Sequence, residues 1–187
     1  MKQHILPAIR LTLVCIIFFC GLYSLLILAI AQVAPAHGEG ETISVNDKIV
    51  GYKLLSQKFT EDKYFDDRPS ASDYNATASG GSNKGPSDPG YLKILQTRVD
   101  TFLVHNPGVD KEEIPSDLIT ESGSGLDPDI SIQGAYIQVK RIAKIRNISE
   151  EKLSVLVDKH IEKPLFGFLG PEKVNVLQLN IDLDALK

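Results

Sequence analysis

The most pronounced pattern along the chain is a long apolar run near its N-terminus. Nearly every residue from Leu11 to Val33 is aliphatic or aromatic, and no charged residue occurs between Arg10 and Glu39. As a helix, these 23 residues would extend about 35 Å, more than the roughly 30 Å of a bilayer's hydrocarbon core. The pattern therefore predicts one transmembrane helix over residues 11–33, preceded by a short N-terminal segment of residues 1–10.

A cleaved secretory signal is the alternative interpretation of this run. Lys2 and Arg10 provide the positive start of a signal, and residues 34–36 are small enough to imitate a cleavage site. The apolar part of a signal is only about 7 to 15 residues long, so we favour a retained anchor. Basic residues before the run and acidic ones after it, from Glu39 onward, place the N-terminus in the cytoplasm and the remainder outside. In a bacterium the remainder would then be periplasmic.

Three stretches beyond the anchor have apolar residues at helical spacing. They cover residues 88–106, 131–147 and 149–163, and each opens on a short polar side chain suited to an N-cap. The first and the third are followed closely by a proline, which cannot continue a helix. We therefore expect three amphipathic helices.

Strand and loop signals occupy the rest of the exported part. Apolar and polar residues alternate over residues 177–183, which predicts a half-buried strand. Residues 50–59 have the composition of a strand or a short helix, and residues 70–90 contain five Ser, four Gly and two Pro, which indicates a long loop.

Together these elements predict the fold class. Helices with a few strands and no regular βαβ order indicate an α+β fold. We expect about three helices with a small sheet, carried as one periplasmic domain over residues 45–187 and joined to the single transmembrane helix by a linker over residues 34–44.

Charge and cysteine content argue against a nucleic-acid partner and exclude a disulfide in this domain. The chain has a net charge of −4, but all 24 acidic residues and 18 of the 20 basic ones follow His37, so that part carries −6. Such acidity argues against nucleic acid as a partner, since phosphate contacts need clustered Lys and Arg. Both cysteines, Cys15 and Cys20, lie inside the predicted span, so the domain contains no disulfide.

Two small-residue segments are candidates for ligand binding. Residues 78–85 have the composition of a phosphate-binding loop but lack its Gly-Lys-Ser/Thr ending, which favours an ordinary flexible or interface loop. Residues 122–129 place Asp127 and Asp129 beside serines and could present oxygens to a cation. Because EF-hand spacing is absent, we favour turn and helix capping for both carboxylates.

No catalytic or metal site follows from the remaining motifs. Ser149 and Lys152 fit the Ser-x-x-Lys pattern of penicillin-binding enzymes, but no Lys-Thr-Gly accompanies them and Ser149 stands at an expected N-cap. The four histidines show no ligand spacing. We predict no catalytic residues and no metal ligands. The alternative is an independent membrane-anchored periplasmic enzyme or binding protein, hydrolase-like through Ser149 and Lys152.

Several short motifs, in order along nearly the whole chain, resemble the C subunit of the bacterial high-affinity potassium-transporting P-type ATPase, the Kdp complex. The motifs are Tyr64-Phe65, Arg68-Pro69-Ser70-Ala71, Tyr74-Asn75, Ser79-Gly80-Gly81-Ser82-Asn83, Pro115-Ser116-Asp117-Leu118-Ile119-Thr120, Ser122-Gly123-Ser124-Gly125-Leu126-Asp127-Pro128-Asp129-Ile130-Ser131, Gly167-Phe168-Leu169-Gly170 and Val174-Asn175-Val176-Leu177-Gln178-Leu179-Asn180.

The resemblance implies a non-catalytic accessory subunit in the bacterial inner membrane. Its implied partners are a channel-like potassium-binding subunit, a P-type ATPase subunit and the lipid bilayer, and its implied roles are assembly and raising the ATP affinity of the hydrolysing subunit as a catalytic chaperone. ATP is implied as a ligand bound mainly by the partner subunit, because the predicted topology places this domain outside the cell.

The family motifs also supply the candidate contact residues for a partner or ligand. Asp129 departs from the family, which commonly has His at that position, so no role that needs an imidazole is expected there. The candidates are Arg68, Asn75, Ser79, Gly80, Gly81, Ser82, Asn83, Ser122, Gly123, Ser124, Gly125, Asp127, Gln138 and Arg141.

Overall fold

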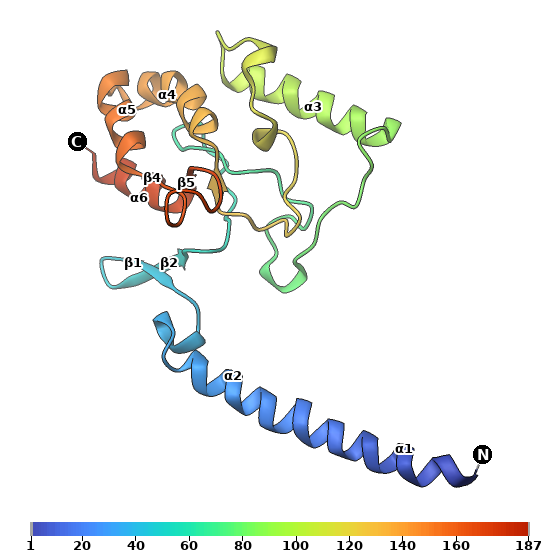
Figure 1. The fold of residues 1–187 in the computed structure, drawn as a ribbon. Coiled ribbons are helices and arrows are strands. Elements are labelled where there is room, and N and C mark those ends of the chain that lie inside the picture. The colour runs from blue at the N-terminus through green and yellow to red at the C-terminus, as the bar shows by residue number, and fades with distance from the viewer. Residues whose placement is uncertain (1, 187) are drawn as a thin grey trace. The chain divides into compact units, whose positions relative to one another are not determined.

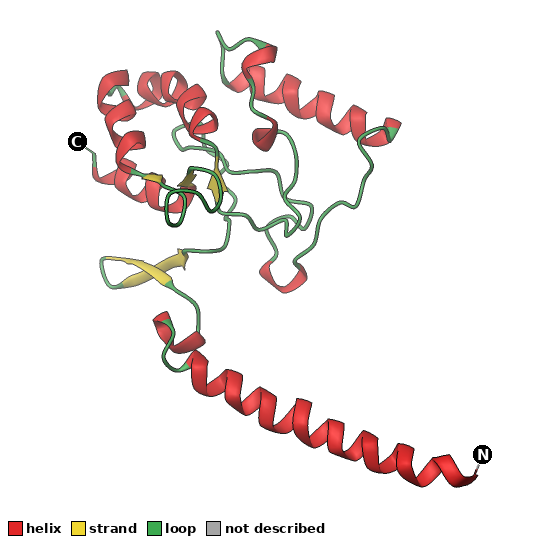
Figure 2. Ribbon diagram, in the orientation of Figure 1, coloured by secondary structure: helices red, strands yellow, loops and turns green. Residues whose placement is uncertain are grey.

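The computed structural model describes residues 2–186 and divides the chain after Glu41 into two compact units (Figure 1). The first unit is a continuous helix followed by a short turn (Figure 2). The second unit contains the remaining helices and both sheets.

The N-terminal helix contains one π-helical stretch between two α-helical ones. Residues His4–Ala31, 28 in all, are long and apolar enough to cross a membrane. The span predicted over residues 11–33 lies almost wholly within this helix, which begins earlier because the segment before Leu11 is also helical. The elements of this unit are α1 (Lys2–Cys15), η1 (Ile16–Tyr23), α2 (Ser24–Ala31) and the 3-10 turn η2 (Pro35–Gly38).

The second unit has an α+β fold, as predicted. It has four α-helices rather than about three, and the described strands are all short. Its elements are β1 (Thr42–Val45), β2 (Lys48–Tyr52), η3 (Ala76–Ala78), α3 (Pro89–His105), η4 (Lys111–Glu113), η5 (Ser116–Leu118), β3 (Asp129–Ile130), α4 (Ile132–Arg146), α5 (Glu150–Lys159), β4 (Ile161–Glu162), β5 (Lys173–Asn175) and α6 (Val176–Ala185).

The second unit contains two antiparallel sheets, one between neighbouring strands and one between strands that are further apart in sequence. β1 and β2 form a hairpin with a register shift between Ile43 and Ser44. The second sheet has the order β3-β5-β4, so its central strand pairs with both neighbours. The strand or short helix expected over residues 50–59 is confirmed only at its start, since β2 ends at Tyr52.

The three predicted helices form where the caps indicated. The side chains of Asp88, Ser131 and Ser149 accept hydrogen bonds from backbone N–H groups three residues ahead, at 2.8, 2.9 and 3.3 Å. Each bond satisfies a donor that the first helical turn leaves without a partner. At the end of α4, Asn147 adopts a left-handed conformation with a φ of 54°, which ends the helix before α5 begins.

The strand predicted over residues 177–183 is wrong, because this segment is helix α6. Asn175 caps the helix by accepting the N–H of Gln178 at 3.1 Å. The buried positions Val176, Leu179, Asn180 and Leu183 recur at helical spacing, not at every second residue. The amide of Asn180, a polar group, completes this buried stripe.

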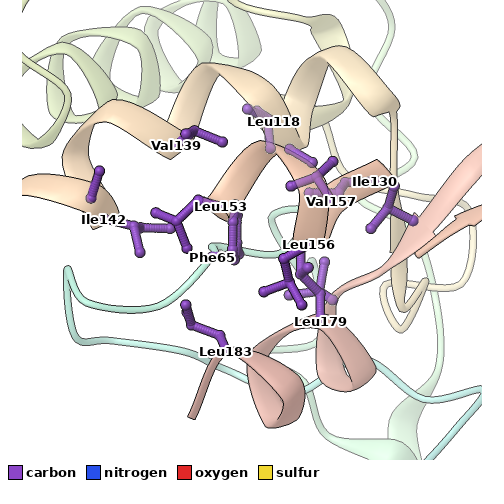
Figure 3. Packing of buried hydrophobic residues seen from close by; sticks show 14 of the residues in the cluster. Phe65, Leu118, Ile130, Val139, Ile142, Leu153, Leu156, Val157, Leu179 and Leu183 are labelled. Carbon is purple, nitrogen blue, oxygen red and sulfur yellow. The ribbon is translucent and has the colours of Figure 1, made fainter. Parts of the chain in front are cut away.

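The core of the second unit lies between α4, α5, α6 and the segment that carries Phe65 (Figure 3). Phe65 is fully buried, and its backbone N–H and carbonyl bond to the Asn180 side chain at 2.8 and 2.9 Å. α3 joins the same core through Phe102. The long segment between β2 and α3 is thereby held against the C-terminal helices, which positions the loop residues described next.

Candidate functional site

The Ser- and Gly-rich loop and the segment around Ser124 lie together, although about 45 residues separate them in sequence. Both the side chain of Ser79 and the N–H of Gly80 donate to the Ser124 carbonyl, at 3.0 and 2.8 Å. Ser70 donates to the Gly125 carbonyl at 2.6 Å. We call residues 70–83 and 122–127 together the loop pair.

Glycines make this close approach possible. Gly125 has a φ of 67°, and a Cβ at this position would lie 2.7 Å from the Gly80 carbonyl oxygen. A Cβ on Gly81 would lie 3.2 Å from the Gly123 carbonyl oxygen. The sequence pattern therefore reflects backbone packing between the two loops, because only a residue without a side chain fits at Gly125.

The segment around Ser122 is held by its own side chains. Ser122 accepts the N–H of Gly125 at 2.9 Å, and Ser124 accepts the N–H of Leu126 at 3.1 Å. A phosphate-binding loop needs such N–H groups turned toward an anion. Here the N–H groups of Gly80, Gly125 and Leu126 already donate inside the protein, which disfavours a nucleotide site in the loop pair.

An ion pair links Asp127 of the loop pair to Arg68, which precedes the first segment of the loop pair in sequence. The Arg68 Nη1 atom lies 2.7 Å from Asp127 Oδ2, and both side chains are half-buried. Asp127 also accepts the N–H of Asp129 at 3.2 Å, which confirms its predicted role in a turn. Asp129 itself does not cap a helix: it lies in β3 and pairs with Lys173 at 2.5 Å. Asp129 is thus held by strand pairing with Asn175 and by the opposite charge of Lys173.

The buried carboxyl of Asp67, next to Arg68 in the chain, was not singled out from the sequence. It accepts hydrogen bonds from the Ser56 hydroxyl at 2.5 Å and from the Arg68 N–H at 2.8 Å. Burial raises the pKa of Asp67 to about 7, against the lowering effect of these two bonds. The side chain is therefore partly protonated at neutral pH.

Gln138 and Arg141 are brought together on α4, but away from solvent. Arg141 donates to Asn106 at 2.8 Å, to Asp66 at 2.9 Å and to Gln138 at 2.7 Å. Gln138 in turn accepts the Asp66 N–H at 2.7 Å, while burial raises the pKa of Asp66 despite the nearby Arg141. These two side chains hold the segment before Arg68 against α4.

The remaining candidates lie at the exposed side of the long loop. Asn75 accepts the N–H of Thr77 at 3.0 Å and so caps the turn η3. Asn83 is exposed and has a φ of 53°. Ser82 approaches Glu121 at 3.5 Å. These side chains shape the loop locally and leave its outer surface accessible.

Glu121 connects the loop pair to α3 and was also missed from the sequence. It accepts a hydrogen bond from Arg98 at 2.5 Å and another from the Tyr91 hydroxyl at 3.1 Å. The Arg98 guanidinium lowers the pKa of this carboxyl below its usual value. No short-range motif marks Glu121, because both partners come from a helix far away in the sequence.

The Ser-x-x-Lys motif has a structural role. The Ser149 hydroxyl oxygen accepts the N–H of Lys152 as the N-cap of α5. Within residues 2–186, no group of three or more His, Cys, Asp or Glu side chains is arranged to hold a metal ion. The loop pair, whose two segments are joined by hydrogen bonds, is therefore the candidate functional site.

Comparison with known proteins gives one consistent result. A family model described as KdpC, K+-transporting ATPase, c chain, matches residues 5–185. The chain is 53% identical over 185 residues to the potassium-transporting ATPase KdpC subunit of Flavobacterium psychrophilum, with 99% of this chain and 100% of the relative covered.

More distant relatives carry the same description. The KdpC subunit of Bacteroides fragilis is 49% identical over 188 residues, covering 99% of this chain and 98% of the relative. That of Caldanaerobacter subterraneus subsp. tengcongensis is 45% identical over 184 residues, covering 98% and 95%.

Proposed function

The chain belongs to the KdpC family of potassium-transporting ATPase subunits, and from this premise we propose that it is a non-catalytic accessory subunit of the pump. In this role it would support assembly and raise the affinity of the hydrolysing subunit for ATP. Its partners would be the channel-like potassium-binding subunit and the P-type ATPase subunit. The similarity extends over essentially the whole chain, which supports carrying the family's role across both units.

The observation that supports this proposal is that N–H groups of the loop pair donate hydrogen bonds within the protein. The backbone N–H groups of Gly80, Gly125 and Leu126 donate within the protein. The residues Ser79, Gly123 and Ser124 are exposed. A pre-formed polar surface binds another protein with little loss of conformational entropy, and it needs no ligand to order it. We therefore assign the loop pair as the docking surface for the channel-like subunit.

The effect on ATP would be indirect. Positive residues at the N-terminus and acidic ones after the helix favour an exported second unit, so this unit would not meet cytoplasmic ATP. A subunit can still change the affinity for a distant ligand if it contacts two states of the pump unequally. Tighter contact with the ATP-binding state would lower the KM for ATP without a nucleotide on this chain.

A matched pair of glycine variants tests the docking surface. A Cβ added at either Gly123 or Gly85 meets no atom within 4 Å, so arginine at each position leaves the fold intact. Gly123 lies in the loop pair and Gly85 lies just outside it. We expect Gly123→Arg to reduce co-purification with the two larger subunits and to raise the KM for ATP several-fold at unchanged kcat, whereas Gly85→Arg matches the wild type.

The same pair can contradict the proposal. Equal assembly and equal KM in both variants would show that the loop pair does not dock on the pump. A fall in kcat at unchanged KM would instead indicate a role in the chemical cycle itself.

Cysteine labelling tests the proposed membrane arrangement. In a chain with Cys15→Ser and Cys20→Ser, we expect Lys84→Cys to react with an impermeant maleimide on intact spheroplasts. His4→Cys should react only after the membrane is permeabilised. Both target positions are exposed in their own units, so burial does not limit the reaction. Labelling of His4→Cys but not Lys84→Cys on intact spheroplasts would place the second unit in the cytoplasm and favour direct nucleotide contact.

A further inference from the structure

The loop between β4 and β5 exposes an unusual concentration of large apolar side chains. Leu165, Phe166, Phe168 and Leu169 are 64, 79, 75 and 51% exposed. No charged residue occurs between Lys163 and Glu172. We call residues 164–170 the apolar loop, which projects beside β4 and β5 in Figure 1. A contiguous exposed apolar patch of this kind indicates a contact with something apolar.

Most backbone N–H groups of the apolar loop form hydrogen bonds within the loop. Leu165 and Leu169 exchange bonds in both directions, at 3.2 and 3.0 Å. The N–H of Gly167 donates to the Pro164 carbonyl at 2.9 Å, and that of Phe168 donates to the Leu165 carbonyl at 3.3 Å. In lipid, where no water can take up a free N–H, a non-helical segment must pair its polar groups internally. This loop does so for four of its N–H groups.

The conformation of the loop is also a constrained one. Phe166 has a φ of 54°, which is uncommon for a residue with a bulky side chain, while Gly167 and Gly170 have φ values of 81° and 96°. Such conformations persist where the surrounding structure enforces them and are concentrated at sites that bind. These φ values, with the Leu165–Leu169 bridge, define the turn that carries the two phenylalanines.

A bilayer fits these properties better than a protein surface does. Protein interfaces surround an apolar centre with a polar rim and form hydrogen bonds across it. The apolar loop has no polar side chain, and four of its N–H groups donate within the loop. Only residues 32–41 separate the N-terminal helix from the second unit, and at about 3.5 Å per residue they let Thr42, where this unit begins, lie at most roughly 35 Å from the helix end.

We propose that the apolar loop inserts into the interface of the membrane to which the N-terminal helix anchors the chain, with Phe166 and Phe168 reaching the boundary between headgroups and acyl chains. Insertion of this kind is shallow, about 5–10 Å, as for interfacial amphipathic segments. The inference rests on the proposed anchoring by the helix but not on the accessory role in the pump. The loop would restrict how the second unit turns about its tether.

Tryptophan fluorescence gives a direct test, because the chain contains no tryptophan. The full chain would be reconstituted into vesicles of phosphatidylethanolamine and phosphatidylglycerol, with or without bromine on the acyl chains. We expect Phe168→Trp to emit at shorter wavelength and to lose intensity with brominated lipid. Phe166→Trp provides a second, equally exposed reporter in case one variant disturbs the loop.

Two further single-tryptophan variants separate the possible outcomes. Tyr23→Trp, in the N-terminal helix, should be quenched if the helix is inserted, whereas Val104→Trp, 77% exposed on α3, should not be quenched. Quenching of Tyr23→Trp without quenching of either loop reporter overturns this inference and leaves the anchor intact. A loop reporter that shifts only after the other pump subunits are added also overturns it, in favour of a protein contact. Loss of quenching in Tyr23→Trp as well overturns the anchoring on which the inference rests.

Discussion

Replacement of Gly125 by alanine is the sharpest test of how the loop pair is built. The residue has a φ of 67°, and the added Cβ would lie 2.7 Å from the Gly80 carbonyl oxygen. That oxygen belongs to the backbone, so a side-chain rotation cannot relieve the contact. The two loops must separate, and the hydrogen bond from the Gly80 N–H to the Ser124 carbonyl is lost or lengthened.

The expected cost follows from these two effects. A left-handed conformation costs an alanine about 1–2 kcal/mol, and the loss of one backbone hydrogen bond adds about 1 kcal/mol. We therefore expect Gly125→Ala to lower the free energy of unfolding of the second unit by about 2–3 kcal/mol. Urea unfolding of the full chain in detergent micelles, followed by near-ultraviolet circular dichroism, would show the change as a lower midpoint at unchanged slope.

Gly123→Ala is the matched control for this experiment. It lies two residues away, and its Cβ would meet no atom within 4 Å. Because alanine only restricts the unfolded chain there, this variant should be neutral or slightly stabilised. Equal midpoints for Gly125→Ala and Gly123→Ala would refute the argument that close backbone packing explains the glycines of this motif.

Three other predictions concern the buried residues Asp67, Arg141 and Leu153. Because the pKa of Asp67 is about 7 when folded, against an ordinary 3.8, the free energy of unfolding should fall by up to about 4 kcal/mol as pH rises from about 4 to 7. Asp67→Asn should remove this part of the pH dependence of the melting temperature, and identical pH profiles would contradict it. Arg141→Met leaves buried acceptors without a donor and should cost about 3–5 kcal/mol by urea unfolding, whereas the exposed Lys144→Met should cost little. Leu153→Ala, at a fully buried position, should cost about 2–5 kcal/mol in the same measurement, and a cost equal to that of exposed Val155→Ala would disprove its place in the core.

The elements with local signals could be predicted from the sequence. The N-terminal helix follows from an apolar run without charges, and the helices after Asp88, Ser131 and Ser149 follow from caps and helical spacing. These features act within one or two turns of the chain, so a short window of residues contains all the information.

Helix α6 shows where such windows fail. Its alternating residues are compatible with a strand, and the polar Asn180 gives no sign of being buried. Asn180 is buried because its amide pairs with the backbone of Phe65, more than a hundred residues away. The two-residue strands β3 and β4 are likewise too short to produce a pattern, and only their pairing with β5 defines them.

The residues of the candidate site also differ in whether the sequence could identify them. Its glycines and serines could be selected from the sequence, but Gln138 and Arg141 appeared equivalent to them, although tertiary contacts bury both in a supporting network. Asp67 and Glu121 could not be selected at all, since burial and distant partners determine their charge states.

The sequence by itself determined the apolar helix, three of the four helices of the second unit, the acidity of that unit and the family. Only the tertiary structure decided which small residues pack backbone against backbone, which carboxyl is buried and which apolar loop remains exposed. The physical reason is that helix formation and membrane insertion depend on neighbouring residues, whereas burial depends on segments that meet only after the chain has folded.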